Sequence, residues 1–207
     1  RKAHNLEIGS SNLPSAIFVH RSKYSSKSES KRSIQYFFIQ RFSFKNMLIL
    51  GIDDSGRGPL IGPMILAGVL IKQEKEKLLK KEGVADSKTL FHNKRIKLSS
   101  LIKDLSDNYH IVKVSPEEID SSIKNGVNLN TLEAIKAAEI INFLNKKREK
   151  IKVIVDCPSN NISRWRDKRL SYIKHRGNLN LICEHKADAN HVSVSAASIL
   201  AKVAREE

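Results

Sequence analysis

The chain has 207 residues, of which 40% are apolar, and it carries a formal net charge of +15. This length and composition suit one globular domain with at most a short appendage, and they argue against a wholly disordered chain. Two cysteines without a CxxC spacing argue against a disulfide framework and a zinc module, and favour a cytoplasmic protein. No apolar run reaches the roughly 20 residues that span a bilayer, so we expect no membrane segment.

The excess of positive charge is shared between two regions. Residues 1–46 contain nine Lys plus Arg and two acids, a net of +7, which leaves +8 for residues 47–207. A basic excess favours binding to a polyanion such as nucleic acid, through counterion release.

Residues 1–46 differ in composition from the rest of the chain. They are rich in Ser, Lys and Arg and show no sustained hydrophobic period, so we expect a mostly disordered basic extension. The composition can mimic an organellar transit peptide. Because Met47 directly precedes the first strand pattern, we favour a dispensable extension or an upstream artefact over targeting. The structured domain is expected over residues 47–207.

From Met47 on, apolar runs alternate with turn residues. We predict strands at residues 47–53, 63–71, 109–114, 151–155 and 179–184, a charged helix or connection at 72–83, and helices at 92–105, from 116, about 130–148, 164–176 and 192–207. The proximity of the first two strands suggests a hairpin. Strands joined first by turns and then by helices predict an α/β domain with a mixed sheet.

Several helix predictions concern individual side chains. The helix at 92–105 should turn Ile96, Leu101, Ile102 and Leu105 toward the core and Lys94, Arg95 and Lys97 toward solvent. We favour Trp165 as part of a helix that covers the sheet over a base-stacking role. Small side chains from Ser195 to Ala201 should permit close packing on the sheet.

Acidic residues stand where predicted strands end. Asp53 and Asp54 end the first strand, Asp156 follows the fourth, and Asp188 precedes the last helix. If the strands that end at Asp53 and Asp156 are parallel neighbours, these acids meet at one sheet edge. Taken singly, Asp156 and Asp188 also fit ordinary capping roles. Together, four carboxylates would repel unless cations bind, and Mg²⁺ or Mn²⁺ suits oxygen ligands.

Gly56-Arg57-Gly58 directly follows the paired acids. The glycines allow a close approach of the backbone to a partner, and Arg57 brings a fixed cation. Two divalent ions about 4 Å apart can carry phosphodiester hydrolysis without a protein nucleophile. The stretch therefore indicates a metal and phosphate site.

The chain resembles the ribonuclease HII family, and its archaeal branch in particular. The resemblance rests on GIDDSGRGPLIGPMILAGV, ADSKTL, NLNTLEA, VIVDCPSNN and HKADANHVSVSAASILAKVARE, which occur in the family order and span Met47 to Glu207. It implies a ribonuclease H-like fold with a five-stranded mixed sheet flanked by helices. It also implies metal-dependent cleavage of RNA in RNA–DNA hybrids and beside single ribonucleotides in duplex DNA, giving 5′-phosphate and 3′-hydroxyl ends.

The resemblance also assigns roles by position. The catalytic and metal-binding acids would be Asp53, Asp54, Asp156 and Asp188, which would hold two Mg²⁺ or Mn²⁺ ions. Gly56, Arg57 and Gly58 would approach the ribonucleotide 2′-hydroxyl, and Lys88 would lie near the substrate backbone. His185 we interpret as structural. The expected state is a monomer, and the resemblance leaves open whether a sliding clamp docks on a C-terminal portion that this chain lacks.

Two departures from the family pattern matter for activity. Asp54 stands where the family usually has Glu, which shortens that ligand by one methylene. The chain also ends at Glu207, before the tyrosine that stacks on the ribonucleotide sugar in the family, so we expect a catalytic domain truncated at its C-terminus.

Other functional classes of protein offer alternative interpretations of the same residues. A binding-only module would use Arg57, Lys88 and the basic stretch at 164–176 on phosphate and leave the acids structural. A P-loop NTPase fits poorly, because Ser87 stands where a glycine must precede the lysine. The related ribonuclease HIII normally carries a folded N-terminal domain, which residues 1–46 are too short and irregular to form.

Overall fold

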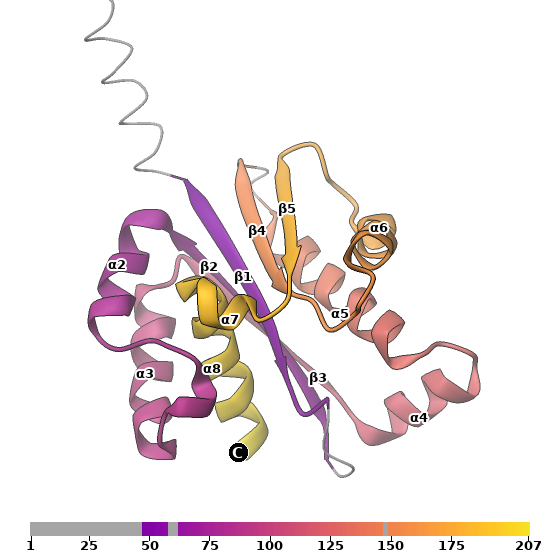
Figure 1. The fold of residues 1–207 in the computed structure, drawn as a ribbon, viewed down its shortest axis with the longest axis horizontal. Helices are drawn as coiled ribbons and strands as arrows, with labels where there is room; N and C mark the ends of the chain where they lie inside the picture. The colour runs from indigo at the N-terminus through magenta and orange to yellow at the C-terminus, as the bar shows by residue number, and fades with distance from the viewer. Residues whose placement is uncertain (1–46, 58–61, 147–148) are drawn as a thin grey trace, which may run out of the picture. The chain divides into compact units, whose positions relative to one another are not determined.

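The computed structural model describes residues 47–57, 62–146 and 149–207, and within these ranges it contains a five-stranded sheet of order β3-β2-β1-β4-β5 (Figure 1). The extension predicted at residues 1–46 lies outside the described residues. The strands are β1 (Leu48–Ser55), β2 (Met64–Lys72), β3 (Asn108–Val114), β4 (Ile151–Asp156) and β5 (Leu179–Glu184). The helices are α2 (Gln73–Lys81), the 3₁₀ turn η1 (Ser87–Thr89), α3 (His92–Leu105), α4 (Pro116–Lys124), α5 (Leu129–Leu144), α6 (Ile162–Tyr172), α7 (Ala187–Asn190) and α8 (Val192–Glu206).

The sheet is mixed, as predicted. β2 pairs antiparallel with both β1 and β3, so the expected hairpin is confirmed. β1, β4 and β5 are parallel neighbours, because helical crossovers return the chain to the same sheet edge before each new strand. The carboxyl ends of β1 and β4 therefore lie side by side, which is the arrangement that the acid pattern required.

Helices cover both faces of the sheet (Figure 1). On one face, α5 and α6 cover Leu50, Ile52 and Leu66, while α2, α3 and α8 cover Ile65 and Ala67 on the other. Consecutive strand residues point to opposite faces, so β1 and β2 are apolar at almost every position rather than alternating. The two faces are called here the α5 face and the α8 face.

α8 packs against β1 at backbone distance. A Cβ built on Gly51 would lie 2.2 Å from the carbonyl carbon of Ser193, so only glycine fits there. Alanines and serines from Ser193 to Ala201 are buried against the sheet. The prediction of close packing through small side chains is confirmed.

Two helix starts show how short polar side chains set element boundaries. The Ser115 hydroxyl accepts from the backbone N–H of Glu118, and Pro116 occupies the first turn of α4, as predicted. For α5 the prediction was wrong by two residues: the cap is Asn128, whose side chain accepts from the N–H of Thr131. The predicted start at Asn130 already lies inside the helix.

The predicted faces of α3 require a correction. Ile96 is 43% exposed, whereas Arg95 is 8% exposed and donates to Glu206 of α8 at 2.7 and 2.9 Å. Ile102 is buried as expected. The long aliphatic stem of Arg95 packs inward while its charge finds a carboxylate on the neighbouring helix, which periodicity alone does not reveal.

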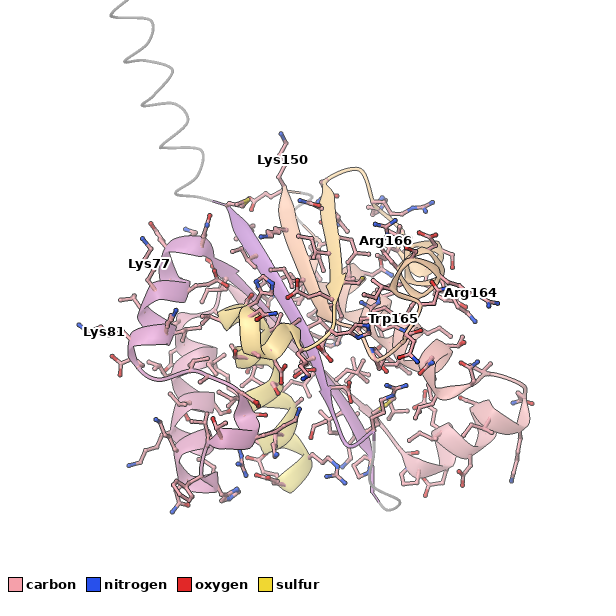
Figure 2. All side chains as sticks on the ribbon, viewed as in Figure 1. Lys77, Lys81, Lys150, Arg164, Trp165 and Arg166 are labelled. Carbon is pink, nitrogen blue, oxygen red and sulfur yellow. The ribbon has the colours of Figure 1, made fainter. Side chains whose placement is uncertain are left out.

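α6 confirms the preferred interpretation of Trp165. The ring is 4% exposed and lies on the inner side of the helix, whereas Arg164 and Arg166 are exposed (Figure 2). Its Nε1 donates to the carbonyl oxygen of Asn130 at 3.3 Å. A buried ring cannot stack on a base, so the alternative role fails. Nowhere in the described ranges is a helix both long and apolar enough to cross a membrane.

Candidate active site

A cleft of about 410 Å³ opens where the carboxyl ends of β1 and β4 meet. Asp53 and Asp54 reach it from β1, Asp156 from the last position of β4, and Asp188 from α7. The other lining residues are Ser55, Gly56, Arg57, Ser87, Lys88, Pro158, Ser198, Lys202 and Arg205. The structure therefore brings all four predicted acids to one cleft.

Asp53 and Asp54 belong to β1 rather than to a following loop, so their side chains alternate between the two faces. Asp53 falls on the α8 face, is 8% exposed and accepts from Ser198, whose hydroxyl lies 2.9 Å from that of Ser87. Burial and the neighbouring Asp54 charge raise the pKa of Asp53 well above its usual value. Burial likewise raises the pKa of Asp54 to about 6, although Arg57 opposes the shift.

Asp156 links β4 to the segment that carries Asp188. Its Oδ1 accepts from the backbone N–H of Ala187 at 2.8 Å, directly after Lys186 in the left-handed conformation (φ 55°). This bond fixes the start of α7, where Asp188 is the next residue. Burial raises the pKa of Asp156, and Asp188 adds to the shift. Asp188 itself pairs with Lys88 at 3.8 Å.

The chemistry of these side chains fits hard divalent cations. The donors are carboxylate oxygens, and burial disfavours their charged forms, so bound cations would relieve the repulsion. Within the described ranges, no three His, Cys, Asp or Glu side chains approach closely enough to form a ready-made metal cluster. The acids share a cleft, and their side chains would have to turn inward to share an ion.

The predicted substrate-binding residues border the same cleft, except Gly58, which lies outside the described residues. Gly56 has φ +96°, and a Cβ there would lie 2.5 Å from both Arg205 Nε and the Pro63 carbonyl oxygen. A side chain at position 56 would be strained and would clash. Lys88 is held in η1, where its backbone N–H donates to Asp86 Oδ1 at 2.9 Å.

Several residues of the site were not predicted. Glu133 of α5 is 3% exposed and lies 3.3 Å from Arg57 Nε, and burial raises its pKa to about 8. The available signal was an acid close to the start of an otherwise largely apolar helix. Ser198, Lys202 and Arg205 line the cleft from α8, where their spacing of three to four residues places them on one helix face.

His185 has the structural role that we expected. Its Nδ1 donates to the carbonyl oxygen of Cys157 at 2.7 Å, which ties the end of β5 to the residue after β4. Within the described residues both cysteines are free, with Cys157 buried and Cys183 partly buried. Neither thiol lines the cleft.

Comparison with known proteins agrees with this geometry. The family model described as "Ribonuclease HII" matches residues 50–207. Ribonuclease HII of Methanocaldococcus jannaschii is 40% identical over 170 residues, covering 78% of this chain and 73% of the relative. Ribonuclease HII of Pyrococcus furiosus is 43% identical over 162 residues, covering 78% and 69%.

Two solved structures share the fold over most of this chain. Ribonuclease H2 from Pyrococcus horikoshii OT3 superposes with a TM-score of 0.68 at 37% identity, covering 77% of this chain and 72% of that one. The PCNA:RNase HII complex from Archaeoglobus fulgidus matches with a TM-score of 0.67 at 35% identity, covering 77% and 73%. The ribonuclease H-like fold predicted from the motifs is thus confirmed.

Proposed function

This chain belongs to the ribonuclease HII family, and we propose that its cleft hydrolyses the RNA strand of RNA–DNA hybrids and also cuts beside single ribonucleotides embedded in duplex DNA. Family membership makes the chain a ribonuclease H-type endonuclease that depends on divalent metal. The proposal adds the mechanism and the range of substrates. The observation that carries it is the meeting of Asp53, Asp54, Asp156 and Asp188 in one cleft.

In this proposal those four aspartates hold two Mg²⁺ or Mn²⁺ ions. Bound there, the ions would supply an activated water and stabilise the leaving 3′ oxygen, so that the products carry 5′-phosphate and 3′-hydroxyl ends. The protein itself positions the carboxylates that would bind these ions. Ser198 donates to Asp53, and the backbone N–H of Ala187 donates to Asp156, and these bonds position both carboxylates in the lining of the cleft.

The cationic residues of the cleft are proposed to bind the nucleic acid. Lys88 pairs with Asp188 at 3.8 Å in the protein alone and is 74% exposed, so it can exchange this carboxylate for a phosphate. Arg57 and the backbone of Gly56 and Gly58 would approach the 2′-hydroxyl, which distinguishes RNA from DNA.

A sliding clamp is the protein partner in this proposal, and a cytoplasmic setting goes with it. Support for the clamp comes from the Archaeoglobus fulgidus relative, which was solved in complex with PCNA. Support for the setting comes from the two free cysteines.

The deciding experiment uses a DNA duplex with one embedded ribonucleotide, incubated with Mg²⁺, Mn²⁺ or EDTA. We expect metal-dependent cleavage at the ribonucleotide and none in EDTA or in an all-DNA duplex. End analysis should find 5′-phosphate and 3′-hydroxyl. A protein that binds the duplex but cuts neither it nor an RNA–DNA hybrid with either metal would contradict the proposal.

A further inference from the structure

The side chain of Arg57 is held by two residues of α5. Its Nε lies 3.3 Å from Glu133 Oε2, and its Nη2 donates to the side-chain oxygen of Asn130. The Arg57 side chain keeps 28% of its surface exposed, while that of Glu133 keeps 3%. One edge of the guanidinium is therefore anchored, while the residue still lines the cleft.

The anchor is itself fixed by α6. Trp165 Nε1 donates to the backbone oxygen of Asn130 at 3.3 Å, and the Arg169 guanidinium carbon lies 3.6 Å from the centre of the Trp165 ring. Arg169 is fully buried. Burial and the Asp54 charge raise the pKa of Glu133, and the charges of the cleft-lining Arg57 and the buried Arg169 oppose that shift.

Buried charges of this kind are weak evidence for stability. Removing a carboxylate and an arginine from water costs several kcal/mol, and well-packed apolar residues at the same positions are often as stable. The arrangement instead fixes the orientation of the Arg57 guanidinium. An arginine on a glycine-flanked turn samples many rotamers, whereas the ion pair with Glu133 and the hydrogen bond to Asn130 restrict the Arg57 guanidinium to one orientation.

We propose that Glu133 is a positioning residue, which orients the Arg57 guanidinium for the ribonucleotide-bearing strand while Asn130, Trp165 and Arg169 hold Glu133 and α5 in place. This inference rests on the proposed function of Arg57. Glu133 does not touch substrate in this account, so every effect of replacing it should pass through Arg57.

The test is a double-mutant cycle between Arg57→Ala and Glu133→Ala on the duplex with one ribonucleotide. We expect Glu133→Ala alone to lower kcat/KM by about 10- to 100-fold, the scale of the coupling energy between residues in direct contact. In the Arg57→Ala background the same change should cost less than about threefold, because the effects of residues that act as one unit do not add. Glu133→Gln, which keeps an acceptor oxygen, should restore most of the rate.

Controls separate positioning from a general loss of structure. Glu139→Ala removes a half-exposed acid from the same helix and should leave kcat/KM within about twofold. If Glu133→Ala does not fold, Asn130→Ala removes the hydrogen-bond acceptor of Arg57 on the same helix and enters the same cycle. Effects of Glu133→Ala and Arg57→Ala that multiply in full, or a Glu133→Ala enzyme with unchanged kcat/KM, would overturn the inference.

Binding measurements keep this inference distinct from the proposed function. Fluorescence anisotropy in EDTA compares the affinities for an RNA–DNA hybrid and for an all-DNA duplex across the same four proteins. A wild type that cuts nothing would refute the nuclease proposal. The coupling between positions 57 and 133 would still appear, or fail to appear, in the hybrid-to-DNA affinity ratio.

Discussion

The two faces of the sheet hold the catalytic end of β1 by different means. On the α8 face, Gly51 meets the backbone of Ser193, and Asp53 is bound by the small hydroxyl of Ser198. On the α5 face, Asp54 shares its surroundings with Arg57 and the buried Glu133. The two neighbouring acids of β1 are thus supported differently. Tight packing fixes Asp53, whereas the surrounding charges shift the pKa of Asp54.

Removing the acid on the α8 face should produce the largest effect. Asp53→Asn should lower hybrid cleavage by at least about 100-fold, because several kcal/mol of transition-state stabilisation depend on metal held by this carboxylate. Gel assays of hybrid cleavage in Mg²⁺ and Mn²⁺ measure the loss.

The same variant separates enzyme from binding module. Hybrid affinity should change by less than about threefold, since the variant keeps every cation that would contact phosphate. Thermal unfolding without metal should show an equal or higher midpoint, because a buried charge is gone. Undiminished cleavage would mean that the acids are structural.

Glycine-to-alanine replacements compare how well each face of the sheet accommodates an added Cβ. Gly51→Ala should destabilise the protein by about 3 kcal/mol, since its Cβ would strike backbone that cannot move alone. Gly68→Ala on β2 should cost less, because its Cβ would meet the Ile140 side chain at 2.3 Å, which can change rotamer. Urea unfolding measures both variants. Gly177→Ala, with open space around it, is the control, and equal costs at 51 and 68 would refute the contrast.

The charged face should make stability depend on pH when divalent ions are absent. The pKa values of Asp54 and Glu133 are raised to about 6 and about 8, so the folded protein keeps protons that the unfolded chain has lost. Unfolding free energy should therefore fall by about 5 kcal/mol as pH rises from about 5 to 8.

Urea unfolding in EDTA measures this pH dependence. Adding Mg²⁺ or Mn²⁺ should restore stability most at the alkaline end, where the carboxylates are charged. Stability that instead rises steadily from pH 5 to 8 in EDTA would show that these acids are not desolvated.

The smallest effect is expected at the acid on the charged face. Asp54 is one methylene shorter than the glutamate usual in the family, and octahedral Mg²⁺ tolerates little distortion. Asp54→Glu should therefore raise hybrid cleavage in Mg²⁺ a few-fold relative to Mn²⁺. Parallel rate measurements in each metal decide the matter, and equal rates for both proteins in both metals would defeat the hypothesis.

Much of the fold was predictable because its signals are local. Continuous apolar runs marked the strands at Leu48 and Ile151, and Ser115 with Pro116 marked the start of α4. Acids at strand ends predicted the shared cleft through the parallel-sheet rule. The start of α5 was misplaced at Asn130 because asparagine is a favourable cap wherever it stands, whereas the cap in the structure is Asn128.

The residues that sequence reasoning missed depend on how helices pack. In the sequence Glu133 is an ordinary helix acid, and its role appears only because α5 packs against the turn at Arg57. Arg95 reads as a surface cation until Glu206 of α8 comes beside it. Lys202 and Arg205 are ordinary basic residues until α8 crosses the end of β1. Such partners are set by tertiary contacts far apart in sequence, which no local period encodes.

The contact of Arg205 with the carbonyl of Pro63 joins positions 142 residues apart. During synthesis the ribosome makes about 5–20 residues per second, so the hairpin of β1 and β2 waits on the order of ten seconds for α8. Through that interval the end of the hairpin that carries Asp53 and Asp54 lacks its contacts with α8. Nascent chains should therefore become active late, after α8 has left the exit tunnel.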